Sequence, residues 1–102
     1  MSYVFPPAPV TAIPVSGTAH EFPVRRVYCV GRNYADHAVE MGHDPDKEAP
    51  FFFQKNPDNI VLGGELPYPD ATADLHHEIE LVVALRTGGK DIPVEAALAC
   101  VF

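Results

Sequence analysis

The sequence predicts an α+β domain that is mainly β, with short strands and only two short helices. Three observations lead to this class. The 102 residues suffice for one small domain, and the 47% apolar content can supply its core. Eleven prolines disfavour long helices. Short β-branched and aromatic runs, bounded by glycine or proline, recur along the chain, as is typical of strands.

The first 23 residues form a proline-rich arm, because five of the eleven prolines lie there. Proline fixes φ and lacks a backbone donor, so we expect an extended arm with a short edge strand around residues 10–13. A loosely ordered leader explains the same composition equally well. We therefore assign residues 1–23 to the arm and residues 24–102 to the domain proper.

Two strands and a helix are predicted next. Residues 27–30 and 51–54 are short β-branched and aromatic runs, and each is interpreted as a strand. Between them we expect a helix near residues 34–41, because Asn33 can cap its start and Gly42 can end it. A polar loop joins this helix to the second strand, and turns follow that strand.

Residues 75–85 have the clearest strand pattern. Their side chains alternate at first and then become continuously apolar, which suits a strand buried on both faces. Asp74, just before this run, is expected to form a turn. A second short helix is predicted near residues 93–99, because Pro93 suits the first helical position and Glu95 the first turn.

Charge and apolar content exclude two classes of partner. Fourteen acidic against seven basic residues give a formal charge of −7, which disfavours nucleic acid and anionic membrane surfaces. No apolar run is long enough to span a bilayer, and no secretory signal is visible. Cys29 and Cys100 lie in apolar surroundings and are interpreted as buried free thiols, with a disulfide between them as the alternative. The sequence therefore predicts a cytoplasmic protein.

Glu78 and Glu80 form the first candidate site. On a strand, side chains two residues apart point to one face, and two carboxylates there repel unless a cation compensates. Carboxylate oxygens suit magnesium, manganese or calcium rather than zinc. His76 shares the parity and could support the site. The alternative is a half-solvated strand face that carries two glutamates and binds nothing.

His37 and Glu40 form the second candidate site, because residues three apart on a helix are neighbours. A carboxylate beside an imidazole raises its basicity and makes it a general base for water. The alternative is a solvated helix face with an incidental pair. Lys55 could present a cation to an oxyanion, or be a surface lysine. Arg32 and Asn33 could bind a substrate carboxylate at the helix N-terminus, although Asn33 is equally explained as a cap.

Three segments together resemble the fumarylacetoacetate hydrolase family. They are YCVGRNYADH at residues 28–37, PFFFQK at 50–55 and HHEIEL at 76–81, in the family's order and approximate spacing. The resemblance runs from about residue 25 to residue 102. The stretch from residue 40 to residue 53 looks most like the fumarylpyruvate hydrolase branch, which acts in aromatic-compound degradation.

The resemblance implies a fold and a role for each candidate residue. The fold would be the N-terminal portion of a mixed β-roll, found in homodimers. Glu78 and Glu80 would be two of three carboxylate ligands of Mg²⁺ or Mn²⁺. His37 and Glu40 would form a water-activating dyad on a helix that closes as a lid. Lys55 would lie near the substrate or its oxyanion.

The resemblance also implies a reaction. The metal-dependent enzyme would hydrolyse a C–C bond in a β-dicarbonyl acid, an acylpyruvate such as fumarylpyruvate, giving fumarate and pyruvate. Decarboxylation or isomerisation of a related oxo-acid is the alternative within the family, and a non-catalytic structural fragment is the alternative outside it. The family's third ligand is an aspartate downstream of residue 102, so we expect a truncated chain that is inactive alone.

Overall fold

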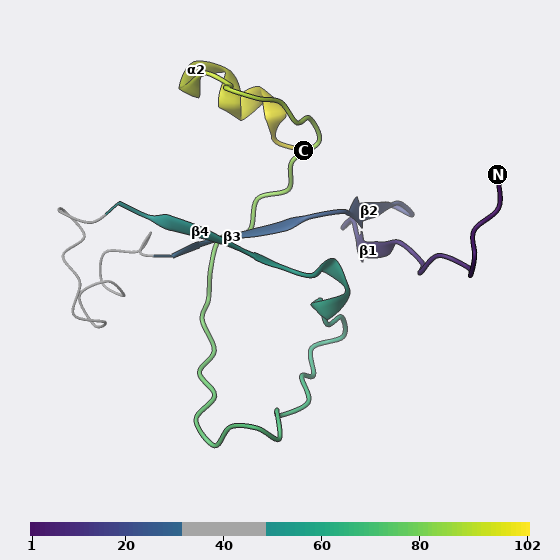
Figure 1. Cartoon of the computed structure of the whole chain (residues 1–102). Coiled ribbons are helices and arrows are strands. Elements are labelled where there is room, and N and C mark those ends of the chain that lie inside the picture. The colour runs from purple at the N-terminus through teal and green to yellow at the C-terminus, as the bar shows by residue number, and fades with distance from the viewer. Residues whose placement is uncertain (32–48) are drawn as a thin grey trace. The chain divides into compact units, whose positions relative to one another are not determined.

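A computed structural model describes residues 1–31 and 49–102 of the protein. Over these residues the chain is mainly β with one short α-helix, as predicted (Figure 1). It divides into two compact units, Met1–Leu66 and Pro67–Phe102, and each is described by itself. The helix expected near residues 34–41 lies outside the described residues. Within the described ranges, no helix has the length and apolar character needed to cross a membrane.

The first unit opens with an antiparallel pair of short strands, β1 (Thr11–Pro14) and β2 (Glu21–Val24). The edge strand expected around residues 10–13 is confirmed as β1. The sequence did not predict β2, because Pro23 lacks a ladder donor and argues against a strand. The structure accommodates Pro23 opposite Ala12 in a two-stranded sheet, where each strand is an edge.

The turn that joins β1 to β2 is held by local hydrogen bonds. Gly17 has a φ of 76°, a left-handed conformation that glycine adopts without steric cost. The backbone N–H and the Oγ1 hydroxyl of Thr18 both donate to the Val15 carbonyl, at 3.2 and 3.1 Å. The same Oγ1 accepts from the His20 N–H at 3.0 Å. The turn therefore depends on a glycine–threonine pair in the arm.

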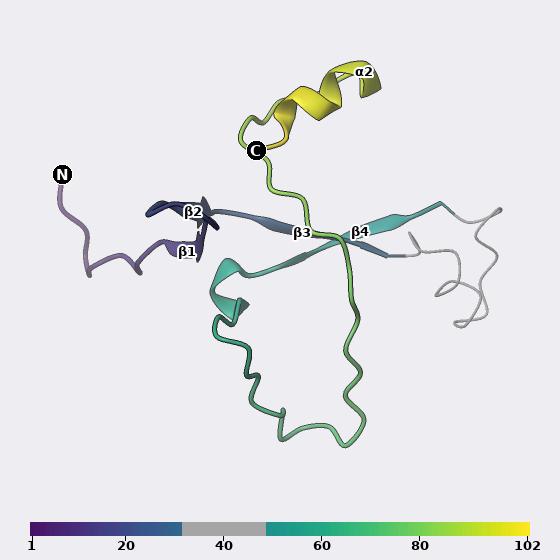
Figure 2. The same cartoon turned by 180° about the vertical axis from the view of Figure 1, so that it is seen from behind.

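A second antiparallel pair follows, made of β3 (Val27–Gly31) and β4 (Phe51–Lys55). Both strands agree with the prediction, and each is one residue longer than expected. Figures 1 and 2 show them side by side from opposite directions. The last rung of the ladder pairs Gly31 with Phe51, and the ring of Phe51 lies over the glycine.

The glycine in this rung leaves room for the aromatic ring. A Cβ atom added at Gly31 would lie 2.2 Å from Cζ of Phe51, far inside a carbon–carbon contact. The Phe51 ring also contacts the Phe53 ring, with centroids 5.9 Å apart and planes tilted by 31°. At this end of the sheet the Phe51 ring therefore packs over Gly31 and beside the Phe53 ring.

The turns expected after β4 are also present. The 3-10 helix η1 (Pro57–Asn59) closes with the Ile60 N–H donating to the Pro57 carbonyl at 3.1 Å. Gly63 and Gly64 have φ values of 96° and 85°, so both adopt backbone conformations that other residues rarely do.

The strand with the clearest sequence pattern, predicted over residues 75–85, is absent from the second unit. Residues 75–84 carry no strand, and only Leu85 forms an isolated antiparallel bridge, with Val101. The prediction of a buried strand over residues 75–85 is therefore wrong for the described structure. A strand needs a neighbouring strand for its hydrogen bonds, and the two sheets of the described residues are both two-stranded and do not include this segment.

The predicted helix near residues 93–99 is confirmed. It consists of α2 (Val94–Ala97), followed directly by the 3-10 helix η2 (Leu98–Cys100). Pro93 is extended, with φ −62° and ψ 149°, so it precedes the first helical residue instead of occupying it. Its fixed φ still favours the start of a helix. In addition, the N–H that proline lacks would have no hydrogen-bond partner at this position.

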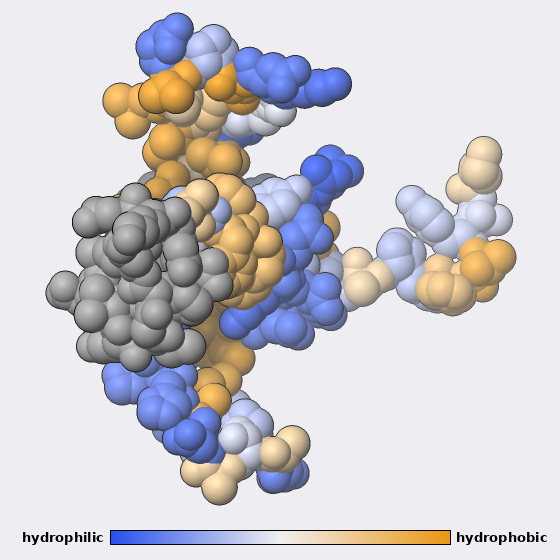
Figure 3. All heavy atoms as spheres, turned by 60° about the vertical axis from the view of Figure 1, so that its left-hand side comes forward, coloured by the Kyte–Doolittle hydropathy of each residue, from blue (hydrophilic) through white to orange (hydrophobic). Residues whose placement is uncertain are grey.

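The described residues lack a closed core. None of them is fully buried, and many large apolar side chains lie at the surface, as the hydropathy colouring of Figure 3 shows. In the first unit the three phenylalanines of β4 are between 44% and 71% exposed. The hydrophobic effect favours covering apolar surface of this kind.

Candidate active site

Lys55 is the last residue of β4, where it pairs with Val27 of β3. The residue is exposed, and the chain turns into Asn56 and η1 immediately after it. Its ammonium group is therefore carried by a hydrogen-bonded strand end and is open to solvent. Such a group can bind an anion or an oxyanion. The sequence predicts Lys55 just after this strand, whereas the structure includes it as the last strand residue, and its catalytic role stays a prediction.

Glu78 and Glu80 lie in the second unit, on the segment 75–84, and both are exposed. The structure does not place them in a strand, so the common strand face that the sequence predicts is absent from the described structure, and their metal-binding role stays a prediction. Between and beyond them the chain exposes apolar side chains, with Ile79 90% and Val82 85% accessible. Two carboxylates on an apolar stretch are the reason to consider this segment a binding site instead of an ordinary polar surface.

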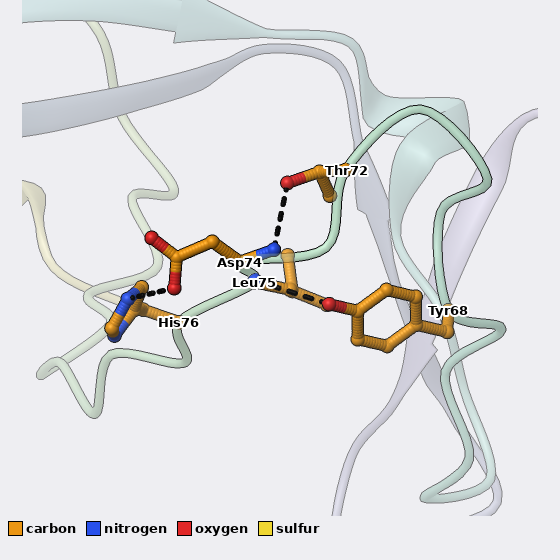
Figure 4. A network of polar contacts seen from close by, with 5 residues as sticks. All are labelled: Tyr68, Thr72, Asp74, Leu75 and His76. Atoms are coloured by element: carbon orange, nitrogen blue, oxygen red, sulfur yellow. Dashed lines mark hydrogen bonds and ion pairs between the residues drawn. The ribbon is translucent and has the colours of Figure 1, made fainter.

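A local polar network lies just before the two glutamates (Figure 4). Asp74 Oδ1 and His76 Nε2 are 2.8 Å apart, and the Asp74 N–H donates to Thr72 Oγ1 at 3.0 Å. The Leu75 N–H donates to the hydroxyl of Tyr68 at 3.3 Å. These contacts hold together the chain that leads into the carboxylate pair.

Part of this network could be predicted from the sequence and part could not. Asp74 is in a locally bonded position, as its turn assignment suggests, but its side chain contacts His76, two residues away. The Asp-x-His spacing was the available signal. The contact between Tyr68 and Leu75 has no such signal, because it spans seven residues without a recognisable turn motif.

Four of the predicted site residues lie outside the described residues. They are His37 and Glu40, the proposed base and its carboxylate, and Arg32 and Asn33, the proposed substrate-binding pair. Gly31, which precedes them, is fixed in the last rung of β3 and β4. Their roles stay predictions from the sequence.

The donor set of Glu78 and Glu80 fits a hard divalent cation. Carboxylate oxygens are the ligands that Mg²⁺ and Mn²⁺ prefer, and both residues are accessible to an ion. In the described part of the chain, no group of three or more histidine, cysteine, aspartate or glutamate residues is arranged to hold a metal. The pair therefore fits a metal but needs further ligands to complete its coordination.

Comparison with known proteins decides the family. Residues 26–102, most of the chain, match the family described as fumarylacetoacetate (FAA) hydrolase C-terminal. The chain belongs to the fumarylacetoacetate hydrolase family. This confirms the resemblance seen in residues 28–37, 50–55 and 76–81.

A solved structure confirms the fold of the fumarylacetoacetate hydrolase family for this chain. The fumarylpyruvate hydrolase of Pseudomonas aeruginosa, crystallised in complex with Mn²⁺ and pyruvate, is 50% identical and superposes with a TM-score of 0.92. The match covers 98% of this chain and 45% of that one. The expected resemblance to fumarylpyruvate hydrolases is thus confirmed, and it covers less than half of that protein.

Curated relatives of the same family carry other activities. The mitochondrial oxaloacetate decarboxylase of Dictyostelium discoideum is 41% identical over 76 residues, which cover 72% of this chain and 34% of that protein. The oxaloacetate tautomerase YisK of Bacillus subtilis is 36% identical over 83 residues, covering 78% of this chain and 28% of that protein. The chain therefore spans about a third of these relatives.

Proposed function

We propose that this chain is the N-terminal part of a metal-dependent hydrolase that cleaves a C–C bond in an acylpyruvate. The substrate class is a β-dicarbonyl acid, and fumarylpyruvate, cleaved to fumarate and pyruvate in aromatic-compound degradation, is the substrate that we favour. One observation carries this proposal. The Pseudomonas aeruginosa fumarylpyruvate hydrolase, half identical to this chain, was crystallised with Mn²⁺ and with pyruvate, which is one of the two expected products.

In this proposal Glu78 and Glu80 hold Mg²⁺ or Mn²⁺. Their negative charge, next to exposed apolar residues, supports binding of a divalent cation over a neutral ligand. A bound divalent cation supplies Lewis acidity toward the substrate's oxygens. The contact of Asp74 with His76, at 2.8 Å, restrains the backbone immediately before Glu78. We therefore assign the glutamates to metal binding and the Asp74–His76 pair to their support.

The proposed base and substrate contacts come from other segments. His37, paired with Glu40, takes a proton from water, and the oxygen of that water bonds to the acyl carbonyl carbon of the substrate. The C–C bond to the pyruvyl group then breaks, and the leaving carbon gains a proton, so one water is consumed for each bond cleaved. Lys55, at the end of β4, and Arg32 with Asn33 would bind the negatively charged oxygens of the substrate.

A second function within the family is favoured by a specific observation. The curated relatives from Dictyostelium discoideum and Bacillus subtilis are an oxaloacetate decarboxylase and an oxaloacetate tautomerase, at 41% and 36% identity. Oxaloacetate and acylpyruvates are both β-dicarbonyl acids, so the same carboxylates and cation suit both. The structural match at 50% identity leads us to rank the hydrolase first. A homodimeric, cytoplasmic enzyme is part of the same proposal.

The test uses a chimaera that joins residues 1–102 to the part of the Pseudomonas aeruginosa hydrolase that they do not cover. The purified chimaera, supplied with Mn²⁺, is incubated in turn with fumarylpyruvate and oxaloacetate, and products are separated by chromatography. We expect stoichiometric fumarate and pyruvate from the first substrate and a much slower change in the second.

The chain of residues 1–102 alone should show no turnover, and a chimaera with Glu80→Gln should lose most of it. Carbon dioxide release or tautomerisation of oxaloacetate at a higher kcat/KM than fumarylpyruvate cleavage would replace the hydrolase proposal with its alternative. A folded chimaera that turns over neither substrate would favour a non-catalytic role for this chain.

A further inference from the structure

A tyrosine between two prolines lies at the start of the second unit. Tyr68 follows Pro67 and precedes Pro69. Proline has a fixed φ and disfavours the helical region for the residue before it, so this sequence favours an extended backbone at Tyr68. The tyrosine side chain has only two main torsions and carries its hydroxyl at a constant distance from Cα. The Pro-Tyr-Pro sequence is therefore suited to hold one polar atom at a set distance from a restrained backbone.

The Tyr68 hydroxyl holds the backbone seven residues further along the chain. Its oxygen accepts a hydrogen bond from the Leu75 N–H at 3.3 Å. Between these two residues the chain turns at residues 70–71, and the Thr72 hydroxyl accepts from the Asp74 N–H at 3.0 Å. Figure 4 shows both hydroxyls directed at neighbouring amides of the same stretch. Side-chain hydroxyls therefore close the loop of residues 68–75 at two places.

This loop leads directly into the proposed metal ligands. Leu75 lies three residues before Glu78 and five before Glu80, in the same compact unit. The loop has little burial to hold it, since Tyr68 is 57% and Leu75 43% exposed. A segment with few buried contacts opens easily, so its conformation depends strongly on its local hydrogen bonds.

The conformation of this segment affects how tightly a cation binds. Two carboxylates bind one cation only in conformations that direct both of them at it, and without a cation their repulsion favours other conformations. The apparent dissociation constant equals the intrinsic constant divided by the fraction of molecules in the binding conformation. A contact that restrains the segment therefore strengthens metal binding without touching the metal.

We propose that Tyr68 is a positioning residue for the metal site. Through its hydrogen bond to the Leu75 N–H, it restrains the segment that carries the two glutamates in the conformation that binds a cation. The inference rests on the proposed assignment of Glu78 and Glu80 to metal binding, and it adds a residue outside that pair. Because coupling between two events is reciprocal, the bound cation must in turn stabilise the hydrogen bond of Tyr68.

The first measurement is Mn²⁺ affinity of the chimaera by calorimetry. Tyr68→Phe removes the hydroxyl and keeps the ring. We expect the dissociation constant for Mn²⁺ to rise by about three- to tenfold, the effect of one lost hydrogen bond, while kcat at saturating Mn²⁺ falls by less than about twofold. Tyr3→Phe is the matched control, because it makes the same change at a tyrosine that is 77% exposed in the N-terminal arm. It should leave Mn²⁺ affinity unchanged.

The second measurement is hydrogen exchange of the Leu75 amide in the chimaera, followed by NMR. Tyr68→Phe should accelerate this exchange by about three- to tenfold, because the amide loses its acceptor. Saturating Mn²⁺ should slow the same exchange when Tyr68 is present and should have a smaller effect in the Tyr68→Phe variant. A tyrosine that only stabilises the loop would change exchange but would leave Mn²⁺ affinity unchanged.

Thr72 provides a conservative pair of variants on the same loop. Thr72→Val removes the hydroxyl that accepts from the Asp74 N–H and keeps the shape of the side chain, whereas Thr72→Ser keeps the hydroxyl. We expect Thr72→Val to weaken Mn²⁺ binding by about threefold or more and Thr72→Ser to stay within about twofold of the unmodified chimaera. This difference would show that the hydroxyl hydrogen bond, and not the bulk of the side chain, restrains the loop.

Unchanged Mn²⁺ affinity in Tyr68→Phe would overturn the proposal, and so would an equal loss in Tyr3→Phe. Glu80→Gln, titrated in the same way, tests the ligand assignment separately. A loss of affinity in Glu80→Gln without one in Tyr68→Phe would overturn the positioning role and leave the proposed function standing. Unchanged affinity in Glu80→Gln would remove the ligand assignment and this inference with it. A loss in both variants, with oxaloacetate as the preferred substrate, would support the positioning role and change only the reaction.

Discussion

Replacing Gly31 with alanine tests the packing of the β3–β4 end directly. The new Cβ would lie 2.2 Å from Cζ and 2.4 Å from Cε1 of Phe51, whereas carbon atoms in contact sit about 3.5–4.0 Å apart. Gly31 is held in the β3–β4 ladder, whereas the ring can turn about its side-chain torsions, so the ring moves. We therefore expect Gly31→Ala to displace Phe51 and to separate it from Phe53.

The size of the effect follows from what the ring covers. Phe51 is 47% exposed, so about half of its surface is covered in the structure. A phenylalanine buries on the order of 200 Å², so displacement exposes up to about 100 Å², or about 2.5 kcal/mol at ~25 cal/mol per Å². Loss of the contact with Phe53 adds about 1 kcal/mol.

Two effects reduce this sum. The displaced ring buries part of its apolar surface again at another position. Alanine is also favoured over glycine in a strand by about 0.5–1 kcal/mol. The clash still outweighs the intrinsic gain of alanine, and the net loss for the Gly31 variant is about 1–2 kcal/mol. The amides of β3 and β4 should then exchange about 5–30 times faster, because local opening becomes easier by that free energy.

The assay is hydrogen exchange followed by mass spectrometry on peptides that cover β3 and β4. Gly88→Ala is the matched control, because a Cβ at Gly88 meets no atom within 4 Å and should leave β3–β4 exchange unchanged. In a Phe51→Ala background, Gly31→Ala should cause no loss of stability and no faster exchange of the β3 and β4 amides. Exchange as slow as in the unmodified chain, or the same acceleration with and without the Phe51 ring, would refute the reasoning.

Three further predictions concern the site and the exposed surface. In the chimaera, Glu80→Gln should weaken Mn²⁺ binding by about tenfold or more, because a charged ligand is lost. Replacement of the exposed Glu65 by glutamine is the control and should leave Mn²⁺ affinity unchanged. Equal Mn²⁺ affinities of the two variants, measured by calorimetry, would contradict the ligand assignment. His37→Ala should lower kcat by roughly 10²-fold or more with metal affinity unchanged, and Glu40→Gln should have a smaller effect of the same kind. Loss of metal binding in His37→Ala, with turnover retained at saturating metal, would instead make this histidine a ligand. The chain of residues 1–102 alone should self-associate or be poorly soluble, since many of its large apolar side chains are exposed. A single monomeric species in sedimentation, together with cooperative unfolding in a denaturation experiment, would contradict this prediction.

The elements that could be predicted are those with a local cause. The strands β3 and β4 are β-branched and aromatic runs between turn residues, and α2 begins after a proline with an acidic residue in its first turn. Such signals lie within a few residues of the element. The strand β2 was missed because Pro23 is a local signal against a strand, and pairing with β1 overrides it.

The segment 75–85 shows what a local pattern leaves open. Alternation and apolar content indicate that a segment suits a sheet, but they do not supply the neighbouring strand, and the described residues do not include one for it beyond Leu85 and Val101. The same holds for the candidate site. The spacing of Glu78 and Glu80 suggests a shared role, whereas their assembly with further ligands depends on contacts between distant parts of a chain.

The last rung of the β3–β4 ladder also bears on how members of this family can diverge. Gly31 and Phe51 are Cα partners, so residues 32–50 leave and re-enter the sheet at adjacent points. The entropy of closing a loop rises only with the logarithm of its length, by about 0.6 kcal/mol for each doubling. Insertions between these two points therefore cost less than the aromatic packing that holds the rung. The number of residues between these two points can thus change among members of the family while β3 and β4 stay paired.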